Sequence, residues 1–341
     1  MSAQQQFFKA LEAAHCFPLW QLGREALTTP GIVPHIWRWR EMRQLAIDSL
    51  TAEQNIAKGG ERRSLLLVNP GSQGAMLRTN NTIISAIQII KPGESATAHR
   101  HSIMALRFIL EGSSAYTVVD GEKVFMEQGD LVITPQWAWH DHAHTNASDK
   151  PMIWFDALDA PMAQFVDAMF IEPYSQDMQE VTVAEGYTAS LLGGGVMRNV
   201  RGRITKRTLP MNYKWNASYQ ALLNAQDHSE FDGAMMEYTN PVDGGHTLPS
   251  TACYLQRLGP REATRTHRHT ESVIYVAAKG AGTIVLDGKR LDWEFGDVFV
   301  VPSWIWHSHE NSSSSSDAVL FSMSDKPVLE ALALDREEAR E

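Results

Sequence analysis

The stretch Gly93-Glu-Ser-Ala-Thr-Ala-His99-Arg-His101, followed by Gly129-Asp-Leu-Val-Ile-Thr-Pro-Gln-Trp-Ala-Trp-His140, decides which fold this chain can adopt. His99 and His101 are two residues apart, and on a β-strand this spacing points both imidazoles to the same face. His140 follows a Gly-Asp turn and a short apolar strand. Three nitrogen donors from neighbouring strands can cover one face of a metal ion and leave the other face open, as catalysis requires. Imidazole suits zinc, copper, iron and nickel, and the spacing does not choose among them.

The same pattern occurs a second time in the C-terminal half of the chain. Residues 266–269 match residues 98–101, and residues 296–307 match residues 129–140. The offset between the copies is 168 residues at the first match and 167 at the second. A near-constant offset over several turn and histidine positions indicates two tandem copies of one domain.

Short apolar and β-branched runs surround both copies. Residues 82–90, 105–110 and 116–119 are predicted strands, and Asp120-Gly121 is typical of a two-residue hairpin turn. Many short strands separated by turn signals favour a β-sandwich or a β-barrel. The first 50 residues combine a helical apolar spacing with several tryptophans, which predicts an arm, and the stretch from Lys326 is predicted to be a terminal helix.

Composition excludes several classes of protein. The 341 residues are 43% hydrophobic and 21% charged, with a net charge of −10, and this acidic balance argues against nucleic acid as a partner. Cys16 and Cys253 have neither disulfide-framework nor zinc-knuckle spacing. No signal-peptide pattern is present, and no apolar run reaches the roughly 18 residues of a membrane span. We therefore expect a cytoplasmic protein with free thiols and no membrane contact.

The glycine before the histidine pair, the Gly129-Asp130 turn, Pro135 and His140 together resemble the two motifs of the cupin family. The resemblance implies a small antiparallel β-barrel with a metal in its mouth. The expected fold is mainly all-β, a bicupin of two tandem antiparallel jelly-roll barrels with a helical N-terminal arm and a C-terminal helix. The expected boundaries are an arm at 1–60, a catalytic N-terminal cupin domain at 61–165, a linker at 166–235 and a C-terminal cupin domain at 236–341.

The cupin pattern usually contains a glutamate ligand that this chain lacks. The corresponding positions are Ala105 in the first copy and Val273 in the second. Three histidines carry no charge, so a divalent ion bound to them keeps its full positive charge. The departure therefore favours an anionic, chelating substrate.

A narrower resemblance is to the gentisate 1,2-dioxygenase family, the bicupin ring-cleaving dioxygenases. It is carried by residues 92–112, by Asn69-Pro70 and Gln88, and by residues 139–142 and 154–159, and it extends from about Pro18 to the C-terminal stretch. It implies an Fe(II) enzyme of aromatic hydrocarbon catabolism, a homotetramer, that converts gentisate (2,5-dihydroxybenzoate) and O2 into maleylpyruvate. Where some relatives have a pocket tryptophan, residues 82–85 contain isoleucines, which leaves the substrate preference open.

The chemistry of the residues agrees with this implication. A divalent ion on three histidines, His99, His101 and His140, keeps adjacent free positions. The carboxylate and phenol oxygens of a 2-hydroxybenzoate can fill two of them, and O2 can fill a third. Metal binding acidifies the phenol as it acidifies bound water, and this makes the ring electron-rich.

Five further residues are candidates for substrate binding or catalysis. Arg107 lies six residues after His101, and an even spacing on a regular strand would turn both side chains into the barrel. Its planar guanidinium suits a bidentate grip on a carboxylate. Arg63 and Gln88 match family substrate contacts, although the adjacent Arg62 is an alternative to Arg63. His142 is a candidate proton donor or relay.

Asp156 is the remaining catalytic candidate, as a carboxylate that orients a ligand or His142. The second copy keeps its three histidines, His267, His269 and His307, but has Tyr275 where the first has Arg107. Tyrosine cannot clamp a carboxylate, so we expect the second site to be non-catalytic for this substrate, whether or not it binds metal.

Other readings remain open at this point. Within the same class of ring-cleaving dioxygenases, the alternative substrates to gentisate are salicylate, a substituted salicylate and 1-hydroxy-2-naphthoate. A second class is another metal enzyme on the same fold, such as an isomerase or a decarboxylase. A third class is a non-catalytic bicupin that binds a ligand, and a half-exposed strand with surface histidines is the alternative to any metal site.

Overall fold

The structure is a computed structural model that describes residues 2–16, 18–21, 31–52, 62–72, 77–191, 209 and 211–340. Residues 1–31 and 32–341 are separate compact units. The first unit contains only the first part of the arm predicted at 1–60, and its first helix begins with a capping box between Ser2 and Gln5; residues 32–52 of the predicted arm belong to the second unit. The middle of the predicted linker, residues 192–208, lies outside the described residues. Among the described helices, none has the length and apolar character needed to cross a membrane.

Short antiparallel strands dominate the second unit, as the turn-rich sequence predicts. The elements are α1 (Ala3–Ala13), η1 (Leu19–Gln21), β1 (His35–Trp37), α3 (Trp39–Ser49), β2 (Arg63–Leu66), β3 (Ile84–Ile90), β4 (Ser95–His101), β5 (Ala105–Glu111), β6 (Ala115–Val119), β7 (Glu122–Phe125), β8 (Leu131–Thr134), β9 (His140–His144), β10 (Met152–Leu158), α4 (Ala160–Phe165), β11 (Ile171–Pro173), α5 (Tyr187–Leu191), β12 (Asn212–Tyr213), α6 (Trp215–Asn224), β13 (Ala234–Glu237), β14 (Ala252–Leu258), β15 (His267–His269), β16 (Val273–Lys279), β17 (Ala281–Leu286), β18 (Lys289–Glu294), β19 (Val298–Val301), β20 (His307–Glu310), β21 (Ala318–Ser324), α7 (Lys326–Ala331) and β22 (Glu337–Ala339).

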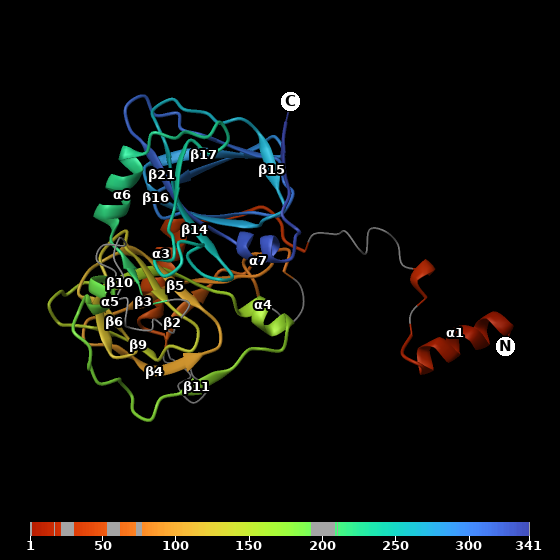
Figure 1. Cartoon of the computed structure of the whole chain (residues 1–341), viewed down its shortest axis with the longest axis horizontal. Helices are drawn as coiled ribbons and strands as arrows, with labels where there is room; N and C mark the ends of the chain where they lie inside the picture. The colour runs from red at the N-terminus through yellow and green to blue at the C-terminus, as the bar shows by residue number, and fades with distance from the viewer. Residues whose placement is uncertain are drawn as a thin grey trace. The chain divides into compact units, whose positions relative to one another are not determined.

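Four sheets form two barrels, each made of one six-stranded and one five-stranded sheet (Figure 1). The N-terminal barrel has the orders β12-β8-β5-β10-β3-β2 and β11-β4-β9-β6-β7. The C-terminal barrel has the orders β1-β19-β16-β21-β14-β13 and β18-β17-β20-β15-β22. The strand pairs are antiparallel, and the second barrel repeats the first strand by strand. The predicted fold, two tandem jelly-roll barrels, is confirmed.

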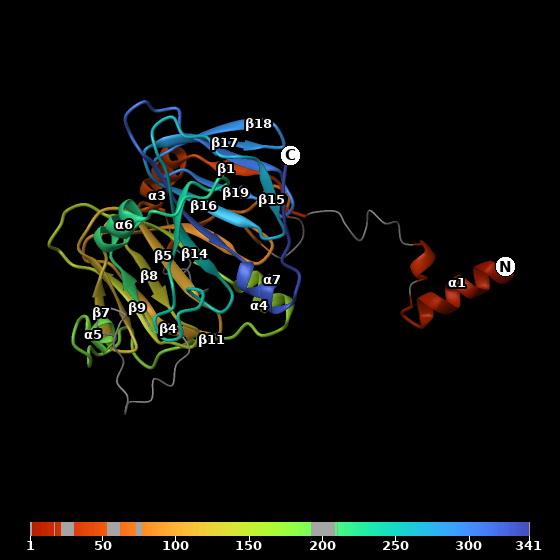
Figure 2. The same cartoon turned by 45° about the horizontal axis from the view of Figure 1, so that its top comes forward.

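Each barrel takes one edge strand from the segment that precedes the other barrel. β1 pairs with β19 of the C-terminal barrel, as Figure 2 shows, and β12 pairs with β8 of the N-terminal barrel. The helices α3 and α6 follow these strands. Asp297 accepts a hydrogen bond from the backbone N–H of Trp39, and Asp130 does the same for Trp215. Residues in the predicted linker therefore complete the N-terminal barrel; the domain boundaries themselves stay a prediction.

The glycines of the two Gly-Asp turns make these crossings possible. Gly129 and Gly296 have φ angles of +85° and +84°, which only glycine adopts readily. A Cβ atom on Gly129 would lie 2.6 Å from the ring of Trp215, and one on Gly296 would lie 2.4 Å from the ring of Trp39. The lack of a Cβ atom in each turn therefore leaves room for the ring of the tryptophan that begins the adjacent helix.

The two barrels share one apolar core between their six-stranded sheets. Phe108 of β5 stacks on Phe321 of β21 with ring centroids 4.5 Å apart and planes 5° from parallel. The core continues through residues of β3, β10, β14 and β16. Alternate residues of each strand point the other way, into the interior of the barrel. One face of each six-stranded sheet therefore forms the interface between the barrels, and the other face lines the barrel interior that holds the histidine triad.

Two buried aspartates connect the barrels in a pseudo-symmetric way. Asp159 accepts hydrogen bonds from the N–H of Met104 in its own barrel and from the hydroxyl of Ser250 in the other half. Asp325 likewise accepts from the N–H of Ser272 and from the hydroxyl of Thr82. Each carboxylate therefore binds one donor from each half of the chain.

Asp159→Ala should lower the free energy of unfolding by about 2–4 kcal/mol, because it leaves two buried donors without an acceptor. Urea unfolding followed by tryptophan fluorescence measures this loss. Asp149→Ala, at an exposed position, is the matched control and should change stability by less than about 0.5 kcal/mol. Equal stability of the two variants would contradict the connection described here.

The C-terminal stretch is helical only in part. Helix α7 ends at Ala331, and residues 337–339 form strand β22, which pairs with β15. The acidic end of the chain, expected to continue the helix, is instead the counterpart of β11, which pairs with β4 in the first barrel. Edge pairing with a histidine-bearing strand outweighs the helical propensity of this short segment.

Candidate metal centre

The three predicted histidines of the N-terminal barrel converge on one point. His99 stands opposite His140 in the β4–β9 pair, and His101 ends β4. The ring centroids are 5.4 Å (His99–His101), 4.3 Å (His99–His140) and 4.7 Å (His101–His140) apart. One nitrogen from each ring lies within 4.8 Å of the other two. This separation allows all three nitrogens to bind one ion.

Backbone carbonyls set the orientation of the rings. Nδ1 of His101 is 2.8 Å from the carbonyl oxygen of Ile103, and Nδ1 of His140 is 3.0 Å from that of Ala138. A carbonyl only accepts, so each Nδ1 carries the proton and each Nε2 keeps its lone pair for a metal. Nδ1 of His99 lies 3.2 Å from the carbonyl oxygen of Thr97.

The environment keeps these rings neutral, as metal ligands must be. Burial, and then the positive charge of Arg62, lowers the pKa of His99 to about 3. Burial lowers the pKa of His101 to about 4 and that of His140 well below its usual value. The donor set is therefore three uncharged imidazoles, which fits iron and its neighbours in the transition series.

Arg107 lies next to this centre, on the facing sheet. Arg107 belongs to β5, whereas His101 ends β4. Arg107 points into the barrel as predicted, but the predicted reason, an even spacing along one shared strand, is wrong. The side chain is 2% exposed. Its NH1 donates to Thr134 Oγ1 at 2.8 Å and its NH2 to His142 Nε2 at 3.0 Å. Arginine has five N–H donors, so others remain for an anion.

The hydrogen bond to Arg107 changes the role expected for His142. An arginine N–H can only donate, so Nε2 of His142 accepts and its ring proton lies on Nδ1. Burial, and then the charge of Arg107, lowers the pKa of His142 well below its usual value. Nε2 therefore accepts a hydrogen bond from the guanidinium. It is not free to act as the proton donor that the sequence analysis expected.

Asp156 is also a neighbour of Arg107. Its Oδ1 lies 3.8 Å from Nε of Arg107, and the two residues face each other in the β5–β10 pair. Burial raises the pKa of Asp156, against the attraction of Arg107, and burial lowers the pKa of Arg107. Desolvation thus outweighs pairing for both groups. The sequence suggested a metal ligand or His142 as the partner, and the structure gives Arg107.

The structure separates the two adjacent arginines Arg62 and Arg63. NH2 of Arg62 lies 2.8 Å from Nδ1 of His99, at the metal centre. Arg63, one residue later on β2, turns away and forms an ion pair with Glu94. Successive residues of a strand point to opposite faces, so only one of the two can face the histidines. The alternative, Arg62, is the residue beside the candidate metal centre.

Gln88 does face the barrel interior, as expected. It is 3% exposed, and its Oε1 accepts a hydrogen bond of 3.1 Å from Ser64. Gln88 stands opposite Trp154 in the β3–β10 pair. Trp154 lies two residues before Asp156 on β10, so both point to the same face of the sheet. It therefore lines the interior surface that Arg107 and Asp156 also occupy.

The pair Arg62 and Arg63 provides a direct test. Arg62→Gln should raise KM for an anionic substrate by about tenfold or more, because it removes a charge-assisted contact at the metal centre. Arg63→Gln removes the same charge from the neighbouring position and should leave KM within about twofold. Steady-state oxygen uptake measures both, and the reverse order of effects would return Arg63 to the site.

The second triad has almost the same geometry as the first. His267, His269 and His307 have centroid separations of 5.4, 4.3 and 4.7 Å, and one nitrogen of each lies within 4.8 Å of the others. Tyr275 occupies the place of Arg107, with its ring 5.2 Å from that of His309. The guanidinium of Arg107, which contacts His142 at the first site, is thus replaced at the second site by the phenol of Tyr275 beside His309.

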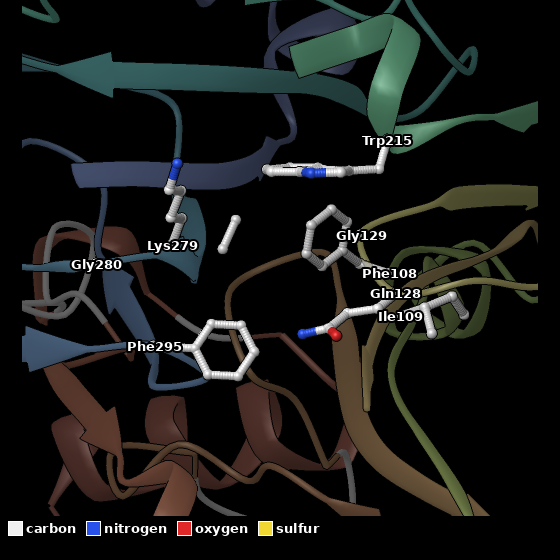
Figure 3. Close-up of a pocket in the computed structure, with 9 residues that line it drawn as sticks. Phe108, Ile109, Gln128, Gly129, Trp215, Lys279, Gly280 and Phe295 are labelled. Atoms are coloured by element: carbon white, nitrogen blue, oxygen red, sulfur yellow. The ribbon is translucent and has the colours of Figure 1, made fainter. Parts of the chain in front are cut away.

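A cavity of about 420 Å³ lies between the barrels, away from both triads (Figure 3). Its lining includes Phe108, Trp215 and Phe295, together with Gln128 and Lys279. Phe108 follows Arg107 on β5 and so points to the opposite face of the sheet. This cavity belongs to the interface, and none of the six triad histidines lines it.

Several residues at the two centres have no signal in the sequence. Thr134 and Ser64, which hold Arg107 and Gln88, are ordinary strand residues. Asp232 and Glu337, which approach the second triad, lie outside the repeated motifs. Glu337 could have been identified as a candidate site residue only if the C-terminal segment had been predicted to be a strand that pairs beside the histidines.

The fold and the two three-histidine centres define a bicupin whose barrels each contain a triad that fits a metal ion. Residues 86–158 and 254–324 both match the family model described as Cupin domain. The chain is 38% identical over 340 residues to gentisate 1,2-dioxygenase 1 of Aquipseudomonas alcaligenes, covering 98% of this chain and 96% of the relative. It is also 38% identical to 5-aminosalicylate 1,2-dioxygenase of a Comamonas species, covering 99% and 93%.

The structural similarity extends over the whole chain. A crystal structure of salicylate 1,2-dioxygenase from Pseudoaminobacter salicylatoxidans, as adducts with gentisate, aligns with a TM-score of 0.90 at 32% identity, covering 100% of this chain and 94% of that one. The chain belongs to the gentisate 1,2-dioxygenase family of bicupin ring-cleaving dioxygenases. It is a dioxygenase of aromatic catabolism with histidine triads that fit metal binding.

Proposed function

We propose that this protein is an Fe(II)-dependent extradiol-type dioxygenase that cleaves gentisate with O2 to give maleylpyruvate, and that the N-terminal centre is its active site. The observation that supports this most directly is the position of two arginines, Arg62 and Arg107, beside an uncharged histidine triad. This combination attracts a small aromatic acid to a metal. The assignment of gentisate rests on similarity and is tested below.

In this proposal His99, His101 and His140 hold the iron through Nε2. Fe(II), when bound, supplies adjacent coordination positions for the substrate oxygens and O2 and a route for electrons between them. The chain contributes orientation. The carbonyl oxygens at Ile103 and Ala138 hold Nδ1–H of two ligands and thereby aim Nε2 of each ring at one point.

The substrate carboxylate is held by Arg107 and Arg62. Arg107 is fixed by Thr134 and His142, so its remaining N–H donors form a rigid fork. Metal binding at Nε2 of His99 requires its proton on Nδ1, where Thr97 accepts it. NH2 of Arg62 also donates to the carbonyl oxygen of Thr97 at 3.0 Å, so this contact remains while the other N–H groups of the guanidinium meet an anionic group at the triad. Arg62 thus replaces Arg63 in the proposed substrate site.

Three further side chains complete the proposal. His142 is a positioning residue because it holds NH2 of Arg107. Asp156 balances part of the guanidinium charge from 3.8 Å. Gln88, fixed by Ser64, offers its amide N–H to a ring hydroxyl of the substrate. These groups restrict the orientation of the aromatic ring with respect to the metal.

Oxygen uptake after anaerobic reconstitution with Fe(II) tests the proposal. The panel is gentisate, salicylate, 5-aminosalicylate and 1-hydroxy-2-naphthoate, with ultraviolet detection of the ring-opened product. We expect the highest kcat/KM with gentisate. Activity on a salicylate without activity on gentisate would transfer the assignment to salicylate, which the equal 38% identity to 5-aminosalicylate 1,2-dioxygenase also supports.

The same experiment discriminates against the other classes. An isomerase or decarboxylase on this scaffold would turn over substrate without oxygen, whereas a ring-cleaving dioxygenase consumes one O2 for each ring opened. A non-catalytic bicupin would bind a member of the panel without turnover. A homotetrameric assembly and a cytoplasmic location are part of the proposal, supported by the family and by the composition, and size-exclusion chromatography with light scattering tests the assembly.

A further inference from the structure

We propose that the C-terminal triad, together with the carboxylate of Asp232, is a second metal centre. In this centre a divalent transition-metal ion has four protein ligands and holds the end of the chain to the barrel. The centre is structural and does not bind the aromatic acid. The inference concerns residues outside the proposed active site and goes beyond the proposed function.

The triad is prepared for a metal in the same way as the first. Nδ1 of His269 is 3.0 Å from the carbonyl oxygen of Glu271, and Nδ1 of His307 is 3.0 Å from that of Ile305. Nδ1 of His267 is 2.9 Å from the carboxylate of Glu337. Each Nδ1 therefore donates its proton outward, and each Nε2 faces the common point with its lone pair.

The inward nitrogens lack partners that would explain their burial. His267 is 3% exposed and His307 is 1% exposed, and among the described residues Nε2 of each makes no hydrogen bond. A buried acceptor without a donor costs about 1–3 kcal/mol. Two such atoms aimed at one point are what a missing cation would satisfy.

Asp232 supplies the fourth ligand. Its Oδ1 lies 3.8 Å from Nε2 of His267. Two ligand atoms on one tetrahedral zinc-like ion are separated by about 3.4 Å, as metal–ligand distances of about 2.0–2.2 Å require. The carboxylate of Asp232 is not within 4.8 Å of all three triad nitrogens, so metal binding has to draw it toward the ion by more than about an ångström to reach this separation. Four protein ligands close the coordination shell, which is the mark of a structural site.

The charges around the two triads have opposite signs. At the first triad, NH2 of Arg62 lies beside Nδ1 of His99; at the second, Glu337 takes the corresponding place beside His267. The cavity of about 260 Å³ at the second triad is lined by four acidic residues, Asp232, Glu237, Glu271 and Glu337. An acidic cavity attracts cations and repels a carboxylate. Lys326, 3.9 Å from Glu271, offsets one of these four charges, and Tyr275, in place of Arg107, adds no positive charge.

The proposed ligands, and Glu337, which accepts from the outer nitrogen of one of them, come from segments that are far apart in the sequence. Asp232 precedes β13, the histidines lie on β15 and β20, and Glu337 begins β22, which pairs with β15. Phe231 stacks on His267 with centroids 5.0 Å apart and covers one side of the ring. One bound ion thus ties the segment before β13 and the end of the chain to the mouth of the barrel.

Metal stoichiometry of the full-length protein tests the site. After removal of metal and titration with Co(II), the wild type should bind two equivalents and His267→Gln should bind one. His99→Gln should also bind one. Asp232→Asn should weaken the second site by about 10–100-fold, the range for disturbed ligand shells, and the four-coordinate visible bands of Co(II) should lose intensity. Asp227→Asn, at an exposed position five residues earlier, is the control.

Hydrogen exchange provides a readout that does not depend on activity. Chelation should increase amide exchange at residues 337–339 in the wild type and in His99→Gln, and it should have no further effect in His267→Gln. One Co(II) equivalent in the wild type that is lost entirely in His99→Gln would overturn the second centre. An unchanged affinity in Asp232→Asn would overturn the fourth ligand, and thermal melting of each variant shows whether it is folded.

Discussion

His99→Ala should abolish turnover, with kcat falling by more than about three orders of magnitude, whereas His267→Gln should retain most of it. The first change removes one of three nitrogens that converge within 4.8 Å, and the two remaining imidazoles bind the ion weakly and leave it wrongly oriented. The second change affects a triad that has no arginine clamp. Oxygen uptake with the best substrate of the panel measures both variants.

Metal content distinguishes the causes of this loss. Each variant should lose one equivalent, so the two proteins contain equal metal but differ in activity. Equal activity would mean that both barrels catalyse the reaction. An inactive His267→Gln beside an active His99→Ala would invert the assignment of the two barrels and assign the chemistry to the C-terminal centre.

Arg107→Ala should lower kcat/KM for the aromatic acid by about a hundred- to a thousandfold, the effect of truncating one member of a buried charged contact. The guanidinium is 2% exposed and is held by Thr134 and His142, so its position is fixed before substrate binds. Arg107→Lys keeps the charge but loses the two-pronged geometry, and it should recover only part of the activity.

Stability has to be separated from catalysis for this residue. Removal of Arg107 leaves Asp156 buried without its cationic neighbour, and breaking a buried pair costs about 3–5 kcal/mol. The double variant Arg107→Met/Asp156→Asn removes both charges and keeps the volume. We expect it to melt close to the wild type while remaining as impaired as Arg107→Ala. Recovered activity in the double variant would show that Arg107 acts only through stability.

Local patterns in the chain predict the barrels and the two triads. A histidine pair at a spacing of two can be read from any strand, because side chains alternate with a period of two. The Gly-Asp turns are also readable, since a positive φ favours glycine, and they occur twice with nearly the same offset. The repeat itself then predicts two copies of one domain. These features depend on neighbours in the sequence, which is why they can be recognised without coordinates.

Contacts between distant segments cannot be recognised in this way. Sequence analysis chose Arg63 over Arg62, because the strand boundary that decides which of the two points inward is set by pairing with β3. It gave His142 a free nitrogen, because nothing local shows that Arg107 reaches it from the facing sheet. It also extended the terminal helix through a segment that pairs with β15.

By itself, then, the sequence determined a mainly β bicupin with two histidine triads and an uncharged ligand set. Only the tertiary structure decided that positive groups surround the first triad and acidic groups the second. Strand alternation is encoded residue by residue, whereas the electric field at a site sums charges from segments as far apart as Asp232 and Glu337. Packing of the whole chain brings those charges together, so their sign at each metal centre appears only after folding.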